Sequence, residues 1–323
     1  MTRTLETSVV IIGGGPVGLC LAMDLAWRGV EVVVIERREA GEPPSVKCNH
    51  VSSRTMETFR RLGFVDQVRA AGLPDDYPND VVVRTRATGY ELMRIHIPCR
   101  RDRYKDTSGP DGWWPTPEPA HRVNQIFLEP VLFESARRSS GVTILNRTEF
   151  TGFEQDADGV TAQALDLDSG EEVRIRARYL VGCEGGRSLV RKAIGATLKG
   201  REVIQRVQSS YIRAPGLYPR ITKPDAWMSY LYAPQRSGNL VAIDGREPGW
   251  STITCWLTKM ASIRSTATGA SAPCWAWTRP SNTSCSARRT GSAGGWWRTA
   301  SGIGGPSSAE TPPTSGSPMQ AMA

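Results

Sequence analysis

The sequence lacks the features that mark several common classes of protein. Its seven cysteines contain no CxxC pair, which excludes zinc-finger spacing and a secreted disulfide framework. Its three histidines, His50, His96 and His121, share no ligand spacing, so no metal site is expected. No apolar run approaches the ~20 residues that span a bilayer, and the first residues have no signal-peptide layout. We therefore expect a soluble, cytoplasmic protein with no membrane span and with unpaired thiols.

Aliphatic residues are nearly absent from residues 261–323. This stretch has no Leu, no Val and only two Ile, but it has twelve Ser and eight Gly. It cannot bury enough apolar area to offset the entropy lost on ordering, so we expect an irregular, disordered tail. Its five Arg and one acidic residue supply +4 of the net charge of +8. Residues 1–260 carry no stripe of basic residues, so nucleic-acid binding is not expected.

The length of 323 residues is enough for two domains, and the 39% that are hydrophobic are enough for a buried core. Residues 8–12 form a β-branched run typical of a strand buried on both faces of a parallel sheet. Then come Gly13-Gly14-Gly15-Pro16-Val17-Gly18, a helical stretch to about Trp27, and a second buried strand over 30–35 that ends in Glu36. Strand, GxGxxG, helix, strand and acid in this order predict a Rossmann-like dinucleotide site.

Each part of this motif has a physical task. Gly13 permits a tight turn, Gly15 lets the backbone approach a pyrophosphate, and Gly18 lets the helix pack closely on the strand. The start of the helix offers N–H groups to the phosphates. Glu36 suits a ribose diol. FAD and NAD are held by the same arrangement, so the motif alone leaves the choice between them open.

Further along, residues 52–62 are predicted to form a helix with Ser52 or Ser53 as its N-cap. Arg54 in its first turn indicates a bound anion, with a solvated arginine as the alternative. Short alternating runs at 148–155, 160–167 and 173–177 predict an antiparallel meander. A separate buried strand is expected at 179–183.

The second half of the chain carries three more strand-like runs. They lie at 207–212, 227–232 and 251–256 and are predicted to form a sheet. Their aromatic residues suit a flat apolar substrate, or they are ordinary core residues.

Taken together, four elements resemble the FAD-dependent aromatic hydroxylases of the para-hydroxybenzoate hydroxylase type. They are the glycine motif at 13–18, Arg54 in its Ser-Arg-Thr-Met-Glu helix, Gln125 ahead of Leu128-Glu129, and a Leu-Val-Gly-Cys-Glu-Gly-Gly-Arg-Ser segment at 180–188. The resemblance covers about residues 5–260. It implies a bound FAD, NADPH or NADH as co-substrate, and O2 activated as a flavin hydroperoxide that hydroxylates a small aromatic substrate.

The resemblance also assigns cofactor-binding residues. It places the FAD pyrophosphate at Gly13, Gly15 and Gly18 and the adenosine ribose at Glu36. Gly14, Pro16, Val17 and Arg37 are counted as further cofactor-binding residues. Arg54 and Gln125 lie near the cofactor, and Glu184, Gly185 and Arg187 form the second motif. The family usually has aspartate where this chain has Glu184. No catalytic residue is named, because in this chemistry the flavin transfers the oxygen.

We therefore predict an α/β protein. Its parts are a Rossmann-like FAD-binding domain with an antiparallel meander, a partial mixed or antiparallel substrate-domain sheet, and an irregular tail. The predicted boundaries are 1–195 for the FAD-binding domain, 196–260 for incomplete substrate-domain strands, and 261–323 for the tail. Part of the substrate domain is expected as an insertion around 80–110.

The third motif of the family, Gly-Asp-Ala-Ala-His, does not occur in this sequence. Residues 308–314 stand at its expected place, and codons chosen for them read Arg-Gly-Asp-Ala-Ala-His when read two bases later. We hypothesise that a frame change near 257–265 produced the tail, and sequencing the gene tests this. A gene with no third-motif codons in any frame would contradict it.

The expected function is thus an FAD-dependent monooxygenase acting on an aromatic, phenolic or polyketide substrate, impaired by the missing third motif. The alternatives are a non-catalytic truncated flavoprotein remnant and another FAD oxidoreductase such as a reductase or halogenase. The sequence leaves open the ring substrate, the choice between NADH and NADPH, and the oligomeric state.

Overall fold

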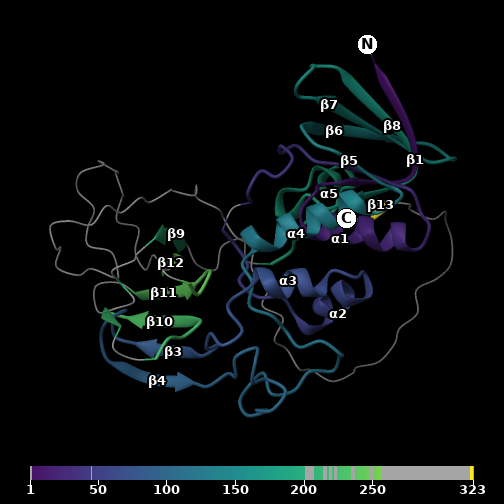
Figure 1. Ribbon diagram of the computed structural model, residues 1–323. Helices are drawn as coiled ribbons and strands as arrows, with labels where there is room; N and C mark the ends of the chain where they lie inside the picture. Colours follow the sequence, from purple (N-terminus) through teal and green to yellow (C-terminus); the bar gives the residue numbers. More distant parts are fainter. Residues whose placement is uncertain are drawn as a thin grey trace, which may run out of the picture. The chain divides into compact units, whose positions relative to one another are not determined.

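A computed structural model describes residues 2–44, 46–200 and, with gaps, 207–256, together with 321–322 (Figure 1). The gaps are 201–206, 214–216, 218–219, 222–223, 234–236 and 247–249. The tail predicted at 261–323 lies outside the described residues except for one short strand at 321–322.

The described chain is a mixed α/β structure, which confirms the predicted fold class. Its helices are α1 (Pro16–Trp27), α2 (Ser53–Arg61), α3 (Val65–Ala71), α4 (Gln125–Arg138) and α5 (Leu189–Ala193), with a 3-10 turn at Gly185–Arg187. Its strands are β1 (Arg3–Ile12), β2 (Val32–Ile35), β3 (Val81–Arg84), β4 (Glu91–Ile95), β5 (Val142–Leu145), β6 (Thr148–Gln155), β7 (Val160–Asp166), β8 (Glu172–Gly182), β9 (Val207–Arg213), β10 (Met228–Tyr232), β11 (Ser237–Ala242), β12 (Trp250–Trp256) and β13 (Ala321–Met322).

The first sheet carries the predicted nucleotide motif. Its strands run in the order β5-β2-β1-β8-β7-β6, and β13 pairs with β8. β5, β2, β1 and β8 are parallel, whereas β8, β7 and β6 are antiparallel and form the predicted meander. The prediction of two separate strands at 173–177 and 179–183 is wrong. They are one strand, β8, because it pairs with β1 from Val173 to Gly182.

Both faces of the parallel strands are buried, as their β-branched runs predict. Val9 and Ile11 of β1 pack with Ala22 of α1 on one face. Val10 and Ile12 point to the other face and pack with residues of the meander and with Val190 of α5. The strict alternation fixes which residues of β1 contact the helix. The end of β1 therefore leads directly into the turn before α1.

The second sheet has the order β4-β3-β10-β11-β12-β9. β3 and β10 are parallel, and the other neighbours are antiparallel. The strands predicted at 207–212, 227–232 and 251–256 are β9, β10 and β12. β11 was not predicted, because Ser237-Gly238-Asn239 reads as a turn and only its last three residues are apolar.

The chain divides into two compact units. The first contains the described residues 2–42, 135–199 and 321–322, and the second contains the described residues of 43–134 and of 200–256. The first sheet belongs to the first unit, and the second sheet belongs to the second unit. The boundaries predicted at 195 and 260 stay a prediction.

The sequence predicts unpaired cysteine thiols and no membrane-spanning helix. Cys20, Cys48, Cys99 and Cys183 are free thiols, and burial raises the pKa of Cys20 to about 12. Within the described part of the chain, no helix is long and apolar enough to cross a membrane.

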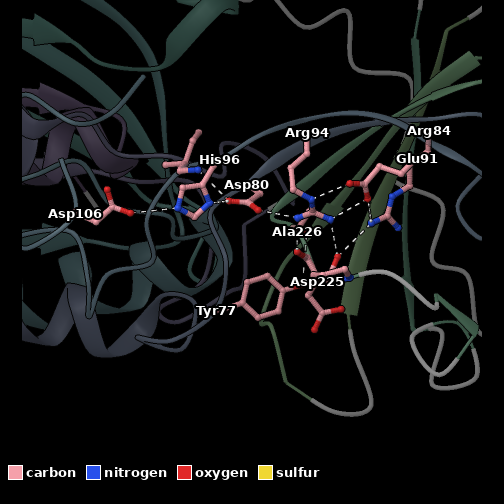
Figure 2. A network of polar contacts seen from close by, with 11 residues as sticks. Tyr77, Asp80, Arg84, Glu91, Arg94, His96, Asp106, Asp225 and Ala226 are labelled. Atoms are coloured by element: carbon pink, nitrogen blue, oxygen red, sulfur yellow. Dashed lines mark hydrogen bonds and ion pairs between the residues drawn. The ribbon is translucent and has the colours of Figure 1, made fainter. Parts of the chain in front are cut away.

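Ion pairs around the buried Asp80 and Arg84 tie the first strands of the second sheet together (Figure 2). Asp80 accepts from Nη1 of Arg94 at 2.7 Å. Glu91 accepts from both Arg94, at 2.9 Å, and Arg84, at 3.2 Å. Both arginines also donate to the carbonyl of Pro224, at 2.8 Å from Arg94 and 3.3 Å from Arg84. This network joins β3 and β4 to the segment that enters β10.

Removing one partner of this network should destabilise the second unit. The Asp80 side chain is 7% exposed and also accepts from the backbone N–H of Ile97 at 2.9 Å. Asp80→Asn leaves Arg84 and Arg94 to share the single carboxylate of Glu91, with one positive charge uncompensated, so we expect the free energy of unfolding to fall by about 3 kcal/mol. Urea denaturation measures this. Asp168→Asn is the control, because its ion pair with Arg147 is exposed and should not change the midpoint.

Candidate dinucleotide-binding site

The turn between β1 and α1 begins at Gly13, whose backbone conformation only glycine tolerates. Gly13 has φ +105°, and its N–H donates to the carbonyl of Ile35 at 2.8 Å. A Cβ there would lie 2.7 Å from the carbonyl oxygen of Cys183. Gly13 therefore joins the carboxyl ends of β1, β2 and β8.

Gly15 differs from the other glycines of the turn because it has free space. Its backbone is extended, with φ −80° and ψ −176°, and no heavy atom lies within 4 Å of a Cβ placed on it. It is the N-cap of α1, with Pro16 in the first turn, no side-chain cap and no acidic residue. Val17 in that turn is 68% exposed. An uncapped helix start beside open space is the geometry that holds a phosphate.

Gly18 serves the packing of α1 on β1. A Cβ on Gly18 would lie 1.9 Å from the carbonyl oxygen of Gly13 and 3.3 Å from Cγ2 of Ile11. The helix can therefore approach the strand only if this residue lacks a side chain.

Glu36 follows β2 directly and turns back toward the glycine turn. Its Oε2 accepts from the N–H of Gly14 at 2.7 Å, and its Oε1 accepts from the N–H and Nε of Arg38 at 2.9 and 3.1 Å. Burial alone would raise the pKa of Glu36. The hydrogen bonds and charge of Arg38, with the bond from Gly14, hold that pKa below its ordinary value. Glu36 is thus a carboxylate at neutral pH, as a ribose diol requires.

Arg38 is a part of this site that the sequence analysis missed. Its Nη2 lies 3.4 Å from both the carbonyl of Gly14 and Oε2 of Glu36. Arg37, which the resemblance counts among the cofactor-binding residues, is 74% exposed and pairs with Glu149 at 3.3 Å, and its cofactor role stays a prediction. The spacing in the sequence could have indicated the contact of Arg38 with Glu36, because residues two apart lie on the same side of an extended chain.

The residues present fit the adenosine diphosphate half of a dinucleotide. Gly15 leaves open the space that a pyrophosphate needs, next to the uncapped start of α1. The carboxylate of Glu36 lies beside this space, because it accepts the hydrogen bond from the N–H of the preceding residue, Gly14. The first unit alone supplies all of these groups.

The segment after β8 is organised around Glu184. Its Oε1 accepts from the N–H groups of Leu189 and Val190 at 2.9 and 3.2 Å, and its Oε2 accepts from Oγ of Ser188 at 2.7 Å. The carboxylate therefore caps α5. Gly185 has φ +79°, and Arg187 is exposed. A cofactor role for Glu184, Gly185 and Arg187 stays a prediction.

Arg54 and Gln125 lie in the second unit. Arg54 is exposed in the first turn of α2, whose N-cap is Ser52 as predicted. Gln125 begins α4, and its Nε2 donates to Oε1 of Glu129 at 2.5 Å. Its N–H donates to the carbonyl of Cys48 at 3.0 Å. Their roles at a cofactor also stay predictions.

The charge of Glu36 predicts a pH dependence of stability. Its folded pKa lies below the unfolded value of ~4.3, so Glu36 stabilises the fold above that value and loses this contribution as the pH falls through the folded pKa. Glu36→Gln has no such charge. Urea denaturation from about pH 7 to about pH 3 should show the stability difference between wild type and E36Q shrinking with acid. A constant difference would contradict the assigned hydrogen bonds.

Residues 6–271 match the family described as "FAD binding domain". This match contains the glycine turn, Glu36 and the segment after β8.

Curated relatives include a monooxygenase named for 2,4-dichlorophenol and a hydroxylase named for aklavinone. The chain is 32% identical over 203 residues to 2,4-dichlorophenol 6-monooxygenase of Cupriavidus pinatubonensis, which is 62% of this chain and 32% of that protein. It is 34% identical over 200 residues to aklavinone 12-hydroxylase DnrF of Streptomyces peucetius subsp. caesius, 60% of this chain and 39% of that protein. The chain thus spans only about a third to two fifths of the length of these relatives.

Solved structures share the fold. RebC soaked with K252c superposes with a TM-score of 0.70 at 34% identity, over 80% of this chain and 48% of that chain. The flavin-dependent monooxygenase PieE in complex with FAD and substrate gives a TM-score of 0.69 at 26% identity, over 80% of this chain and 44% of that chain.

Proposed function

The chain belongs to the FAD binding domain family. We propose that it acts as an FAD-dependent monooxygenase that hydroxylates an aromatic, phenolic or polyketide substrate with NADPH or NADH and O2. The observation that carries this proposal is the cradle of the first unit, with open space at Gly15 and the Glu36 carboxylate on Gly14. Two relatives, named as a 2,4-dichlorophenol 6-monooxygenase and an aklavinone 12-hydroxylase, support the substrate class.

Each cradle residue then has a task toward FAD. The open backbone at Gly15 and the start of α1 receive the pyrophosphate, and Glu36 accepts hydrogen bonds from the adenosine ribose. Arg38 keeps Glu36 ionised and oriented. The bound flavin would supply reduction by the nicotinamide nucleotide and activation of O2.

The remaining assignments extend this proposal. Arg54 and Gln125 in the second unit, and Glu184, Gly185 and Arg187 after β8, are assigned to FAD as the resemblance to the aromatic hydroxylases implies. Glu184 acts there through α5, because its carboxylate is already committed to the helix start. No described side chain is assigned the chemical step.

We further propose that turnover is impaired, because the sequence has no third FAD motif. The competing candidates are a flavoprotein remnant without turnover and another FAD oxidoreductase. The remnant predicts FAD binding with no oxidation of NADPH. A reductase predicts NADPH oxidation that a phenol does not stimulate.

The test is NADPH and NADH oxidation by the full chain reconstituted with FAD, with and without phenol or 2,4-dichlorophenol. The proposal predicts oxidation that the phenol stimulates, together with a hydroxylated product. Phenol-independent oxidation would favour the reductase. A flavin-loaded protein with no oxidation would favour the remnant.

A further inference from the structure

Arg84 is a buried arginine of the network in Figure 2, and one of its N–H groups has no partner among the described residues. The residue is 2% exposed. Its Nη1 donates to the carbonyl of Ala87 at 3.3 Å. Its Nη2 donates to Glu91 at 3.2 Å and to the carbonyl of Pro224 at 3.3 Å. Its Nε is buried and forms no hydrogen bond within the described part of the chain.

An unpartnered Nε does not mark a site by itself. The same is true of Nε of Arg100, Arg103, Arg122 and Arg191 among the described residues. At Arg84, however, this group coincides with a cavity that the residue lines. Buried N–H groups are almost always hydrogen-bonded, because an unsatisfied one costs free energy. The two observations together point to a ligand.

The cavity lies between one face of the second sheet and the segment that enters β10. Val82 of β3 pairs with Ser229 of β10, which in turn pairs with Leu240 of β11. Arg84 follows Val82 by two residues, so its side chain lies on the same face as these three. The cavity is lined by Arg84, Ser229 and Leu240 from this face and by Ile221, Asp225 and Ala226 from the segment before β10.

The size of the cavity limits the ligand to one small molecule. Its volume is about 10 Å³. A water molecule requires on the order of 10–15 Å³ on this measure and at least two polar partners. Arg84 offers a donor through Nε, and the hydroxyl of Ser229 can both donate and accept. Ser229 is 5% exposed, so both groups are buried.

The charges around Arg84 favour a neutral ligand over an anion. Arg84 and Arg94 share the carboxylate of Glu91. Arg94 also donates to the carboxylate of Asp80. The carboxylate of Asp225 interacts with the charge of Arg84 as well. Among these described groups no positive charge is in excess, so an anion would gain little by binding.

We propose that one buried water molecule is a fixed part of this cavity, where it accepts from Nε of Arg84 and donates to Oγ of Ser229. The water joins β3 to β10 through their side chains, in addition to the pairing of their backbones. It also completes the hydrogen bonding of Arg84. This site goes beyond the proposed function, because it requires neither FAD nor turnover.

The alternative is a dry cavity in which the two groups stay unsatisfied. The two possibilities predict opposite effects of removing the Ser229 hydroxyl. A hydroxyl that holds the water contributes to stability, so its removal is destabilising. A buried hydroxyl without a partner costs free energy, so its removal is neutral or stabilising.

The first test is a high-resolution crystal structure of the full chain. We expect electron density for one water within about 3.2 Å of both Nε of Arg84 and Oγ of Ser229. In crystals of Ser229→Ala the density of this water should weaken, because one of its two partners is gone. A well-ordered cavity without such density in the wild type would overturn the proposal.

The second test measures stability by urea denaturation of the full chain. Ser229→Ala should raise the unfolding equilibrium constant about fivefold. Ser237→Ala is the matched control, because Ser237 is a half-buried serine of β11 that is not among the residues lining the cavity. An unfolding constant in S229A equal to that of S237A, or lower, would overturn the proposal. If S229A does not fold, the crystal structure of the wild type decides alone.

Discussion

Replacing Gly15 with alanine should lower the affinity of the chain for FAD about tenfold, or ~1.4 kcal/mol, while the free energy of unfolding stays unchanged. The fold tolerates the methyl group, because no atom lies within 4 Å of it and φ −80° is open to any residue. The pyrophosphate does not tolerate it, because the methyl group occupies the space of closest approach to the backbone.

Flavin fluorescence titration measures this affinity, and urea denaturation measures the stability. Gly170→Ala provides a control for an added methyl group in open space at a distant turn, although its φ of +72° costs some stability. FAD binding should be unchanged in G170A. Unchanged FAD affinity in G15A would show that the pyrophosphate does not lie at this turn.

Replacing Gly18 with alanine, unlike replacing Gly15, should lower the free energy of unfolding. The new Cβ would lie 1.9 Å from the carbonyl oxygen of Gly13, so the helix or the turn must move. We expect the free energy of unfolding to fall by about 3 kcal/mol, as for overpacked cores. FAD binding should fall as well, because the turn at Gly13 is displaced.

Comparison of the two variants distinguishes contact with the cofactor from support of the turn. Urea denaturation of G18A and G15A under identical conditions is the measurement. If G18A were as stable as the wild type, the close packing of α1 on β1 would be contradicted.

The local features of the site could be predicted from the sequence. The β-branched run of β1, the spacing of Gly13, Gly15 and Gly18, and the acid after β2 each follow from short-range rules. The meander could be predicted because Asp-Gly and Ser-Gly turns separate its alternating runs.

Features that depend on distant partners were missed. β8 is one strand because β1 pairs with its whole length, which its own residues do not reveal. The contacts of Arg38 with Glu36 and with the carbonyl of Gly14 were missed, because they form only when the chain turns back after β2. The cavity beside Arg84 joins residues 84, 225, 229 and 240, and no periodicity connects positions so far apart.

The central claim is that the first unit holds FAD in the cradle at Gly13–Gly18 and Glu36. The most direct measurement is the visible absorption spectrum of the full chain after incubation with FAD and gel filtration, repeated with excess ADP. We predict flavin bands that travel with the protein and that ADP reduces by competing for the same site. A folded protein that emerges colourless, or flavin bands that ADP leaves unchanged, would contradict the account.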